Sequence, residues 1–264
     1  MTKLIIFTDL DGTLLSHNTY DFTPALSMLE TLKHKSIPVI LASSKTAAEI
    51  FEIQKEMKLE AYPAIVENGA GILTPGAQIT HYNTEIYDGI LRAVMRLPLE
   101  FRAHFTGFSQ WSVEDISNKT GLTLERAALA KQRQFSEPGL WTGTRQKQVV
   151  FEALLKRHGI YARKGGRFLT LTKEDSKADL MKFILSEIEP NTGEAVFSVA
   201  LGDAPNDIEM IETADIGVIV SNPNNAPLPK LKGEQQGHIF RTTLPGPEGW
   251  VQAVEQILRN QDME

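Results

Sequence analysis

The chain has 264 residues, 42% of them hydrophobic and 23% charged, which suits one large α/β domain or a core domain with a smaller insert. Its lack of cysteine excludes disulfides and thiolate metal sites, so we expect a cytoplasmic protein in which oxygen or nitrogen atoms hold any metal. The net charge of −6 argues against a nucleic-acid partner, no apolar run is long enough to span a membrane, and the totals indicate no particular oligomeric state.

The first part of the chain alternates short apolar runs with amphipathic stretches. Buried strands are predicted at residues 4–8, 38–42 and 64–66, and apolar side chains at helical spacing predict helices at 24–35 and 46–57. Each predicted strand is continuously apolar instead of alternating between apolar and polar residues. That pattern is typical of a parallel sheet covered by helices on both faces.

The middle of the chain departs from this pattern and indicates a separate α+β insert. An alternating stretch predicts an edge strand at 78–82, and the remaining predicted elements are helices at 84–96, within 112–133 and at 148–157, and strands at 160–162 and 168–172. We therefore expect a cap domain at residues 83–169 and a core domain formed by residues 1–82 and 170–264.

The core pattern returns in the last third of the chain. The predicted elements there are helices at 177–188, 207–213 and 249–259, and strands at 195–201 and 216–220. Residues 221–237 are rich in Asn, Pro and Lys and are expected to form a mobile loop. The fold class predicted from the whole chain is α/β, with a Rossmann-like parallel-sheet core and an inserted α+β cap.

The candidate chemistry lies just past the C-terminal ends of predicted strands, the edge where open α/β sheets bind ligands. The segment Asp9-Leu10-Asp11-Gly12-Thr13 follows the first strand. Asp9 is a candidate nucleophile toward phosphorus once a metal reduces the repulsion between anions, and Asp11 is a candidate acid and base. The alternative is a surface turn, in which Asp and Gly are common.

A hydroxyl and a lysine stand at the starts of two predicted helices. Backbone N–H groups at such a start bind phosphate oxygens together with the hydroxyl of Ser43, although Ser43 or Ser44 in that place is also an ordinary helix cap. Lys177 stands near the start of a later helix, where its charge can neutralise phosphate. Taken alone, Lys177 is better explained as a solvated surface lysine.

A second group of acids follows the strand predicted at 195–201. Mg²⁺ takes one or two carboxylates and keeps several waters, and Asp203 is a candidate ligand. Asp207, four residues later, is a candidate partner of a water on the metal or of Lys177. The alternative is a Gly-Asp turn leading into a capped helix, but such a turn does not explain why so many acids meet at one edge of the sheet.

The order of these signals resembles the haloacid-dehalogenase-like phosphatase superfamily over residues 1–80 and 170–264. The resemblance implies a cap inserted between the second and third motifs and a Mg²⁺ cofactor. It also implies the roles of nucleophile for Asp9, acid and base for Asp11, phosphate binding for Ser43, charge neutralisation for Lys177, and metal binding for Asp9, Asp11, Asp203 and Asp207.

A closer resemblance, to the mannosyl-3-phosphoglycerate phosphatase family, runs nearly end to end. The segments that carry it are 39–46, Glu67-Asn68-Gly69-Ala70, Thr120-Gly121-Leu122, Ser136-Glu137-Pro138, Gly165-Gly166-Arg167-Phe168, 202–207 and Gly246-Pro247-Glu248-Gly249-Trp250. The substrate contacts that it implies are Ser44, Lys45, Asn68, Gly166 and Arg167. The chain departs from the family where Leu169 and Thr170 stand in place of a frequent histidine, which bears on selectivity.

The implied substrate is a small phosphorylated sugar acid, mannosyl- or glucosyl-3-phosphoglycerate, which carries a carboxylate besides its phosphate. Arg167, beside two glycines, can present a bidentate fork to that carboxylate; Arg163, Lys164 and Arg133 are further candidates, and the alternative for each is a solvated surface cation. Two other functions stay open. One is another sugar-phosphate phosphatase or phosphotransferase of the same superfamily, and the other is a catalytically inactive sugar-binding module, against which the full set of acids argues.

Overall fold

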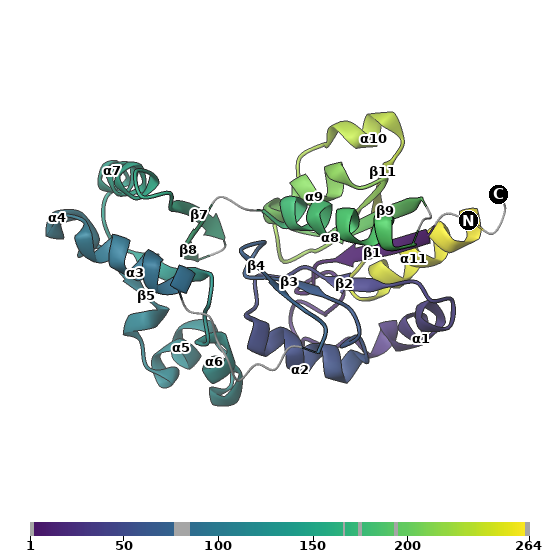
Figure 1. The fold of residues 1–264 in the computed structure, drawn as a ribbon, viewed down its shortest axis with the longest axis horizontal. Coiled ribbons are helices and arrows are strands. Elements are labelled where there is room, and N and C mark those ends of the chain that lie inside the picture. Colours follow the sequence, from purple (N-terminus) through teal and green to yellow (C-terminus); the bar gives the residue numbers. More distant parts are fainter. Residues whose placement is uncertain (1–2, 77–84, 166, 174–175, 193–194, 262–264) are drawn as a thin grey trace.

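The computed structural model describes residues 3–76, 85–165, 167–173, 176–192 and 195–261. The strand expected at 78–82 and the candidate contact Gly166 lie outside these residues. Figure 1 shows two parts side by side, a larger one built around a parallel sheet and a smaller one built around an antiparallel sheet. None of the described helices is both long and apolar enough to cross a membrane.

The larger part is built around a five-stranded parallel sheet. In spatial order its strands are β11 (Ile239–Pro245), β10 (Ile216–Ser221), β9 (Val196–Gly202), β1 (Lys3–Thr8) and β2 (Val39–Leu41). Leu4 and Ile6 of β1 belong to one cluster of buried side chains, and Ile5 and Phe7 belong to another. Burial on both faces explains why β1 is continuously apolar, and the expected parallel α/β core is confirmed.

Helices cover both faces of this sheet. The helices that pack on one face are α1 (Leu26–His34), which follows a short 3-10 turn at Thr23–Ala25, α2 (Ala47–Met57) and α11 (Glu248–Gln261). Those on the other face are α8 (Lys177–Thr192) and α9 (Ile208–Thr213), the latter preceded by a 3-10 turn at Pro205–Asp207. Because both faces are covered, a ligand can reach the sheet only at the ends of its strands.

Two features of the larger part differ from what the sequence predicts. β3 (Ala64–Val66), expected in the parallel sheet, pairs antiparallel with β4 (Gly71–Leu73) and meets the main sheet through a parallel bridge between Ala42 and Ile65. The chain reverses directly after β3, so the returning segment is the nearest partner for its backbone. The segment expected to be a mobile loop ends in α10 (Lys232–Gln236), which lies against β11, an edge strand that the pattern did not predict.

The smaller part, which we call the cap, is a four-stranded antiparallel sheet with helices packed on it. In spatial order its strands are β5 (Phe105–Gly107), β6 (Ser136–Trp141), β8 (Phe168–Thr172) and β7 (Tyr161–Gly165). Its helices are α3 (Glu85–Arg96), α4 (Leu99–Arg102), α5 (Val113–Thr120), α6 (Leu124–Ala130) and α7 (Arg145–Lys156), with a 3-10 turn at Phe108–Gln110. The mixed α+β character agrees with the expected cap.

The two faces of the cap sheet differ in character. Leu169 and Leu171 of β8 pack with α3 and α7 in one buried cluster, whereas Phe168, Thr170 and Thr172 line a cleft. Strand alternation therefore gives the cap one apolar face and one face open to a ligand. Because β8 is paired along its whole length, the domain division expected at residue 170 falls inside a strand, and the boundaries of core and cap stay a prediction.

Candidate functional site

The C-terminal ends of three neighbouring strands bring polar side chains together. Asp9 directly follows β1, Ser43 lies just past β2, and Asp203 directly follows β9. The strands are parallel and adjacent in the order β9, β1, β2, so these residues share one edge of the sheet.

Lys177, the first residue of α8, is a fully buried cation at this edge. Its Nζ lies 2.6 Å from Asp9 Oδ1 and 2.7 Å from Asp207 Oδ1. Burial lowers the pKa of Lys177, but the charges of Asp207 and Asp9 outweigh burial and hold this pKa above its usual value. Burial raises the pKa of Asp9 well above its usual range. The charge of Lys177 lowers this pKa, and the neighbouring carboxylates raise it further. One buried ammonium therefore bridges two buried carboxylates.

Asp203 is held by neutral donors. Thr13 Oγ1 donates to Asp203 Oδ1 at 3.1 Å, while the side-chain amides of Asn222 and Asn225 donate to Oδ2 at 2.7 and 2.9 Å. Gly12 makes this packing possible, because its φ is +89° and a Cβ there would lie 2.3 Å from Asn222 Nδ2. Burial raises the pKa of Asp203, and the amide and hydroxyl donors offset this only in part. These donors orient the carboxylate without neutralising it.

Asp11 is paired with a second lysine. Lys45 Nζ lies 2.8 Å from Asp11 Oδ2 and 5.1 Å from the centre of the Tyr20 ring. Burial lowers the pKa of Lys45, but Asp11 and Glu49 outweigh burial and raise it above its usual value. Asp11 Oδ1 is buried and has no hydrogen-bond partner within the described part of the chain. A buried oxygen in that state, beside other carboxylates, points to a ligand site.

The donor set fits a hard divalent cation such as Mg²⁺. One carboxylate oxygen each from Asp9, Asp203 and Asp207 lies within 4.8 Å of the others, and all three residues are buried. With Asp11, the group holds four carboxylates against the two ammonium groups described above, which leaves a formal charge of −2. Carboxylate oxygens are the ligands that Mg²⁺ prefers in proteins.

Asp207 is the least available of the predicted metal ligands. Its Oδ1 accepts from Lys177, and its Oδ2 accepts the N–H groups of Asp203 and Ala204 at 3.2 and 3.0 Å. Because both oxygens already have protein donors, the geometry favours the second role considered for Asp207, that of holding Lys177.

A tryptophan supports the backbone that carries Asp9. Trp250 of α11 is fully buried, and its Nε1 donates to Thr8 Oγ1 at 3.1 Å. Thr8 Oγ1 in turn donates to the carbonyl oxygen of Asp9 at 2.8 Å. The C-terminal segment around Trp250 therefore acts on the end of β1 from the face opposite α8.

Neither Ser43 nor Ser44, the two serines considered from the sequence, caps helix α2. Thr46 caps α2 in a capping box with Glu49, while Ser43 is buried and its Oγ accepts the N–H of Lys45 at 3.3 Å. Ser44 is exposed and lines the cleft. Helix capping therefore does not account for Ser43 and Ser44.

A cleft of about 610 Å³ extends from this edge across to the cap, a volume typical of small-molecule sites. The predicted substrate contacts that line it are Ser44, Lys45, Asn68 and Arg167. Further cations on the cap side are Arg133, Arg163 and Lys164. The cleft meets the acidic group at Lys45 and at Asn225, which bind Asp11 and Asp203.

Arg167 is exposed on the cap side of the cleft. Its Nη1 donates to the carbonyl oxygen of Lys119, and its guanidinium carbon lies 5.8 Å from the centre of the Phe168 ring. Both anchors belong to the cap, so Arg167 can reach a ligand only as part of the cap.

Some side chains of the site were not predicted. Asn222 and Asn225 hold Asp203, yet they fall in the segment expected to be a mobile loop. The available hint is that this Asn-rich segment follows a core strand, as the acidic segments do. Glu67 belongs to a segment that carries the family resemblance, but its role was not predicted, because its partners lie more than 60 residues away, in the cap.

The chain is similar to known proteins along nearly its whole length. The sequence profile of the haloacid dehalogenase-like hydrolases matches residues 6–228. A glucosyl-3-phosphoglycerate/mannosyl-3-phosphoglycerate phosphatase from Persephonella marina is 33% identical over 268 residues, which cover 97% of each chain.

Solved structures of low identity share the fold. A phosphatase of the haloalkanoate enzyme superfamily from Bacteroides thetaiotaomicron is 19% identical, with a TM-score of 0.66 and coverage of 97% of this chain and 95% of its own. The sucrose-phosphatase from Synechocystis, solved with sucrose and phosphate, is 16% identical, with a TM-score of 0.63 and coverage of 97% and 98%. At these identities the likeness concerns the fold alone.

Replacing Lys177 with methionine is expected to destabilise the protein strongly. The variant leaves Asp9 and Asp207 buried without their counter-charge, which costs about 3–5 kcal/mol in the free energy of unfolding. Urea unfolding of the chelator-treated protein measures the loss. The double variant with Lys177→Met and Asp207→Asn removes one of the stranded charges and should recover part of the stability.

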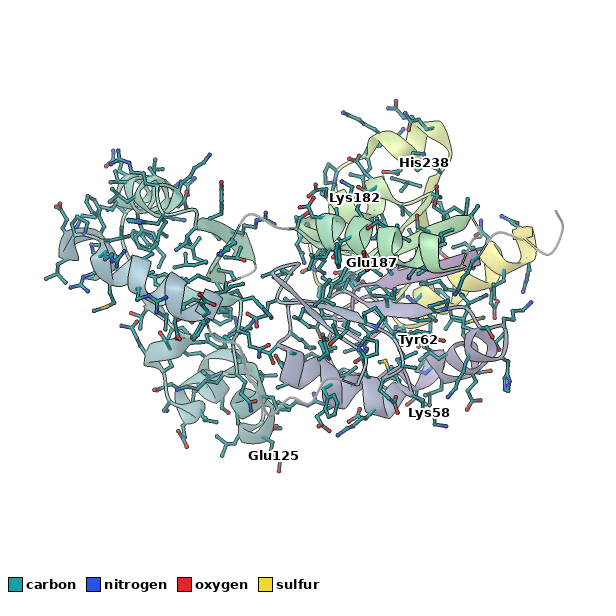
Figure 2. All side chains as sticks on the ribbon, viewed as in Figure 1. Lys58, Tyr62, Glu125, Lys182, Glu187 and His238 are labelled. Atoms are coloured by element: carbon teal, nitrogen blue, oxygen red, sulfur yellow. The ribbon has the colours of Figure 1, made fainter. Side chains whose placement is uncertain are left out.

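Lys182→Met is the matched control, because Lys182 lies on the same helix with an exposed side chain (Figure 2). Its unfolding midpoint should stay near that of the wild type. Equal midpoints for Lys177→Met and Lys182→Met would show that the buried ammonium does not stabilise the carboxylates.

Proposed function

The chain belongs to the haloacid dehalogenase-like hydrolase family, and we propose that this hydrolase is a Mg²⁺-dependent phosphatase that forms an aspartyl phosphate on Asp9. Its proposed substrate is mannosyl- or glucosyl-3-phosphoglycerate, and its products are the glycosylglycerate and inorganic phosphate. The observation that carries the proposal is a buried group, Asp9, Asp203 and Lys177, beside a cleft that suits a small sugar acid.

The choice of substrate is supported by the relative from Persephonella marina. The 33% identity to that enzyme extends over 97% of both chains, so it includes the cap as well as the core. Cap residues line the cleft, and a sugar bound there would place its phosphate toward the acidic group. A likeness confined to the core would support the chemistry but not the substrate.

In the first step, a carboxylate oxygen of Asp9 attacks phosphorus, and the bond from phosphorus to the glycerate oxygen breaks as the new P–O bond forms. Asp11 gives a proton to the leaving oxygen. Lys45 holds Asp11 Oδ2, so the proton is carried on Oδ1, the oxygen without a partner in the described part of the chain. Lys177 keeps Asp9 in place by its bond to Oδ1.

In the second step, Asp11 takes a proton from water as the water oxygen attacks the phosphorus of the aspartyl phosphate. The P–O bond to Asp9 breaks, inorganic phosphate leaves, and both carboxyl groups return to their starting states. The cap covers the cleft during transfer and must open for release.

Asp9 and Asp203 would hold Mg²⁺, which when bound neutralises the charge between the phosphate and the attacking carboxylate. Asp11 is left to the proton transfer, because Lys45 takes its other oxygen. Lys177 cannot do this alone, because its charge is already shared between Asp9 and Asp207. Thr13 and the two amides on Asp203 orient that carboxylate for the same purpose.

A screen for phosphate release tests the proposal. Sugar phosphates and glycosyl phosphoglycerates are each incubated with the protein and Mg²⁺, and inorganic phosphate is measured. Release without an added acceptor supports a phosphatase over a phosphotransferase. Sugar binding without release of phosphate from any of these compounds would support the inactive binding module instead.

Asp9→Asn is expected to lower kcat by at least about a thousandfold, because the nucleophile and the proton donor act as a unit and the loss of either removes most of the catalysis. The amide keeps the shape of the side chain but cannot attack phosphorus. Trapping of the wild type with beryllofluoride should mark Asp9. Thermal unfolding checks that the variant folds, and wild-type turnover in folded Asp9→Asn would falsify the mechanism.

Chelation is expected to abolish activity, and Mg²⁺ should restore it while Zn²⁺ should not substitute well. Asp203→Ala should raise the Mg²⁺ concentration required or remove activity altogether. A readout independent of turnover is the rise in Tm that Mg²⁺ gives to the wild type, which Asp203→Ala should reduce. Full activity in metal-free protein rules out this part of the proposal.

Arg167→Ala is expected to weaken use of a glycosyl phosphoglycerate by roughly 2–4 kcal/mol in kcat/KM, as for a lost charge-assisted pair. Hydrolysis of p-nitrophenyl phosphate, which has no carboxylate, should be largely kept. Arg157→Ala, at an exposed cap position after α7, is the control. Equal losses on both substrates would assign Arg167 to the phosphate or the fold, and no loss on either would leave the carboxylate to another residue.

A further inference from the structure

Three consecutive peptide carbonyls of the loop after β2 are each held by a hydrogen bond. Ser43 O accepts the N–H of Asn68 at 2.8 Å, and Lys45 O accepts the N–H of Glu67 at 2.9 Å. Between them, Ser44 O accepts from Arg133 Nη1 at 3.1 Å. A trans peptide points its C=O and N–H in opposite directions, so these bonds also fix the N–H groups of residues 44–46. Two of these groups already have protein acceptors, because the N–H of Lys45 donates to Ser43 Oγ at 3.3 Å and that of Thr46 donates to Glu49 Oε2 at 2.9 Å. The bond to Ser44 O therefore holds the Ser43 hydroxyl, the proposed phosphate contact, through the N–H of Lys45.

The middle bond is the one that comes from the cap. Arg133 lies between α6 and β6, and its side chain is only 8% exposed. Its Nε donates to Ala130 O at 3.1 Å, its Nη1 donates to Ser136 Oγ at 3.4 Å, and its guanidinium lies 5.5 Å from the centre of the Phe108 ring. These three anchors belong to the cap, so Arg133 keeps its contact with Ser44 only while the cap is docked on the core.

A buried carboxylate from the core holds the same junction. Glu67 is 1% exposed, and its Oε1 accepts the N–H of Gln134 at 2.9 Å. Its Oε2 accepts from Ser136 Oγ at 2.6 Å and from the N–H of Phe135 at 3.2 Å. Arg133 Nη1 lies 3.6 Å from the same oxygen. One core carboxylate therefore contacts four successive cap residues, and its own backbone N–H holds the loop after β2.

The backbone that carries Glu67 adopts an uncommon conformation. Glu67, Asn68 and Gly69 have φ values of +50°, +63° and +94°. Successive left-handed residues persist only where the surroundings hold them. Here a Cβ on Gly69 would lie 2.1 Å from the carbonyl carbon of Ser176, and Asn68 Oδ1 accepts from Asn206 Nδ2 at 3.0 Å. This short segment therefore meets the cap, the loop after β2 and the start of α8.

We infer that Arg133 is a positioning residue of the phosphate site and that Glu67 fixes the position of Arg133. The phosphate-binding loop is then complete only when the cap is docked on the core. The inference rests on the proposed function, because it takes the loop after β2 as the phosphate-binding element. A ligand that draws the cap onto the core thereby completes the site that binds its own phosphate. The coupling favours substrates that contact both parts.

Arg133→Met tests the inference in the full-length protein. Binding of inorganic phosphate, measured by calorimetry with Mg²⁺, should weaken by about tenfold or more, because a bond from a charged donor is lost. KM for p-nitrophenyl phosphate should rise by a similar factor while kcat changes much less. Hydrogen exchange of the backbone amides at 44–46 should quicken in the ligand-free variant, with exchange elsewhere in the core unchanged.

Two further variants and a control make the test specific. Arg133→Lys keeps a cationic donor and should recover part of the phosphate affinity. Glu67→Gln places an amide N–H₂ donor next to the groups of residues 134–136 that donate to Glu67, so it should weaken phosphate binding as Arg133→Met does. It replaces Arg133→Met in the test if that variant does not fold. Arg157→Met, an exposed cap arginine, should match the wild type.

Wild-type phosphate affinity and wild-type exchange at 44–46 in both Arg133→Met and Glu67→Gln would overturn the inference. Lost affinity with unchanged exchange at 44–46 would overturn it too, because Arg133 would then contact phosphate directly. Faster exchange throughout the core would reduce Arg133 to a structural contact. A wild type that neither binds phosphate nor hydrolyses a monoester would count against the proposed function, while exchange at 44–46 would still decide whether Arg133 positions the loop.

Discussion

The site depends on one buried ammonium that holds two buried carboxylates at the edge of the sheet. Removing one partner of a buried ion pair costs about 3–5 kcal/mol, a large part of the net stability of a domain, so the fold depends strongly on Lys177 beside Asp9 and Asp207. The ammonium arrives from α8 on one face of the sheet, and Trp250 of α11 supports the same strand end from the other. The core helices therefore fix the position of Asp9 as well as cover the sheet.

The lysines do not neutralise all of the carboxylates, and the negative charge that remains suits a metal cation. Lys177 and Lys45 leave the four carboxylates with a formal charge of −2, and burial raises the pKa values of Asp9 and Asp203. A divalent cation resolves this imbalance with oxygen ligands already in place. Under the proposed function, the cation that would offset this negative charge would also ease the approach of an anionic phosphate.

The junction of core and cap brings the rest of the site together. The segment from Glu67 to Gly69 contacts the cap, the loop after β2 and the start of α8, so one short segment joins these three places. The alternation of β8 turns Thr170 and Thr172 toward the cleft and Leu169 and Leu171 into the cap interior. Near the position where a histidine is frequent in the family that the sequence resembles, this chain therefore presents Thr170 to the cleft.

Features that depend on neighbours along the chain could be predicted from the amino-acid order. Continuous apolar runs marked β1, β2 and β9, helical spacing marked the helices between them, and acids directly after two of those strands marked the reactive edge. Features that depend on distant partners became visible only in the folded chain. Three kinds of contact leave no periodic signal in the sequence, because packing between elements sets each of them. They are the hydrogen bonds from Asn222 and Asn225 to Asp203, the hydrogen bond from Arg133 to Ser44, and the pairing of β3 with β4. The sequence shows that Lys177 is a cation, but its ion pair with Asp9 depends on the fold. The fold brings Lys177 Nζ to 2.6 Å from Asp9 Oδ1, although the two residues are 168 positions apart.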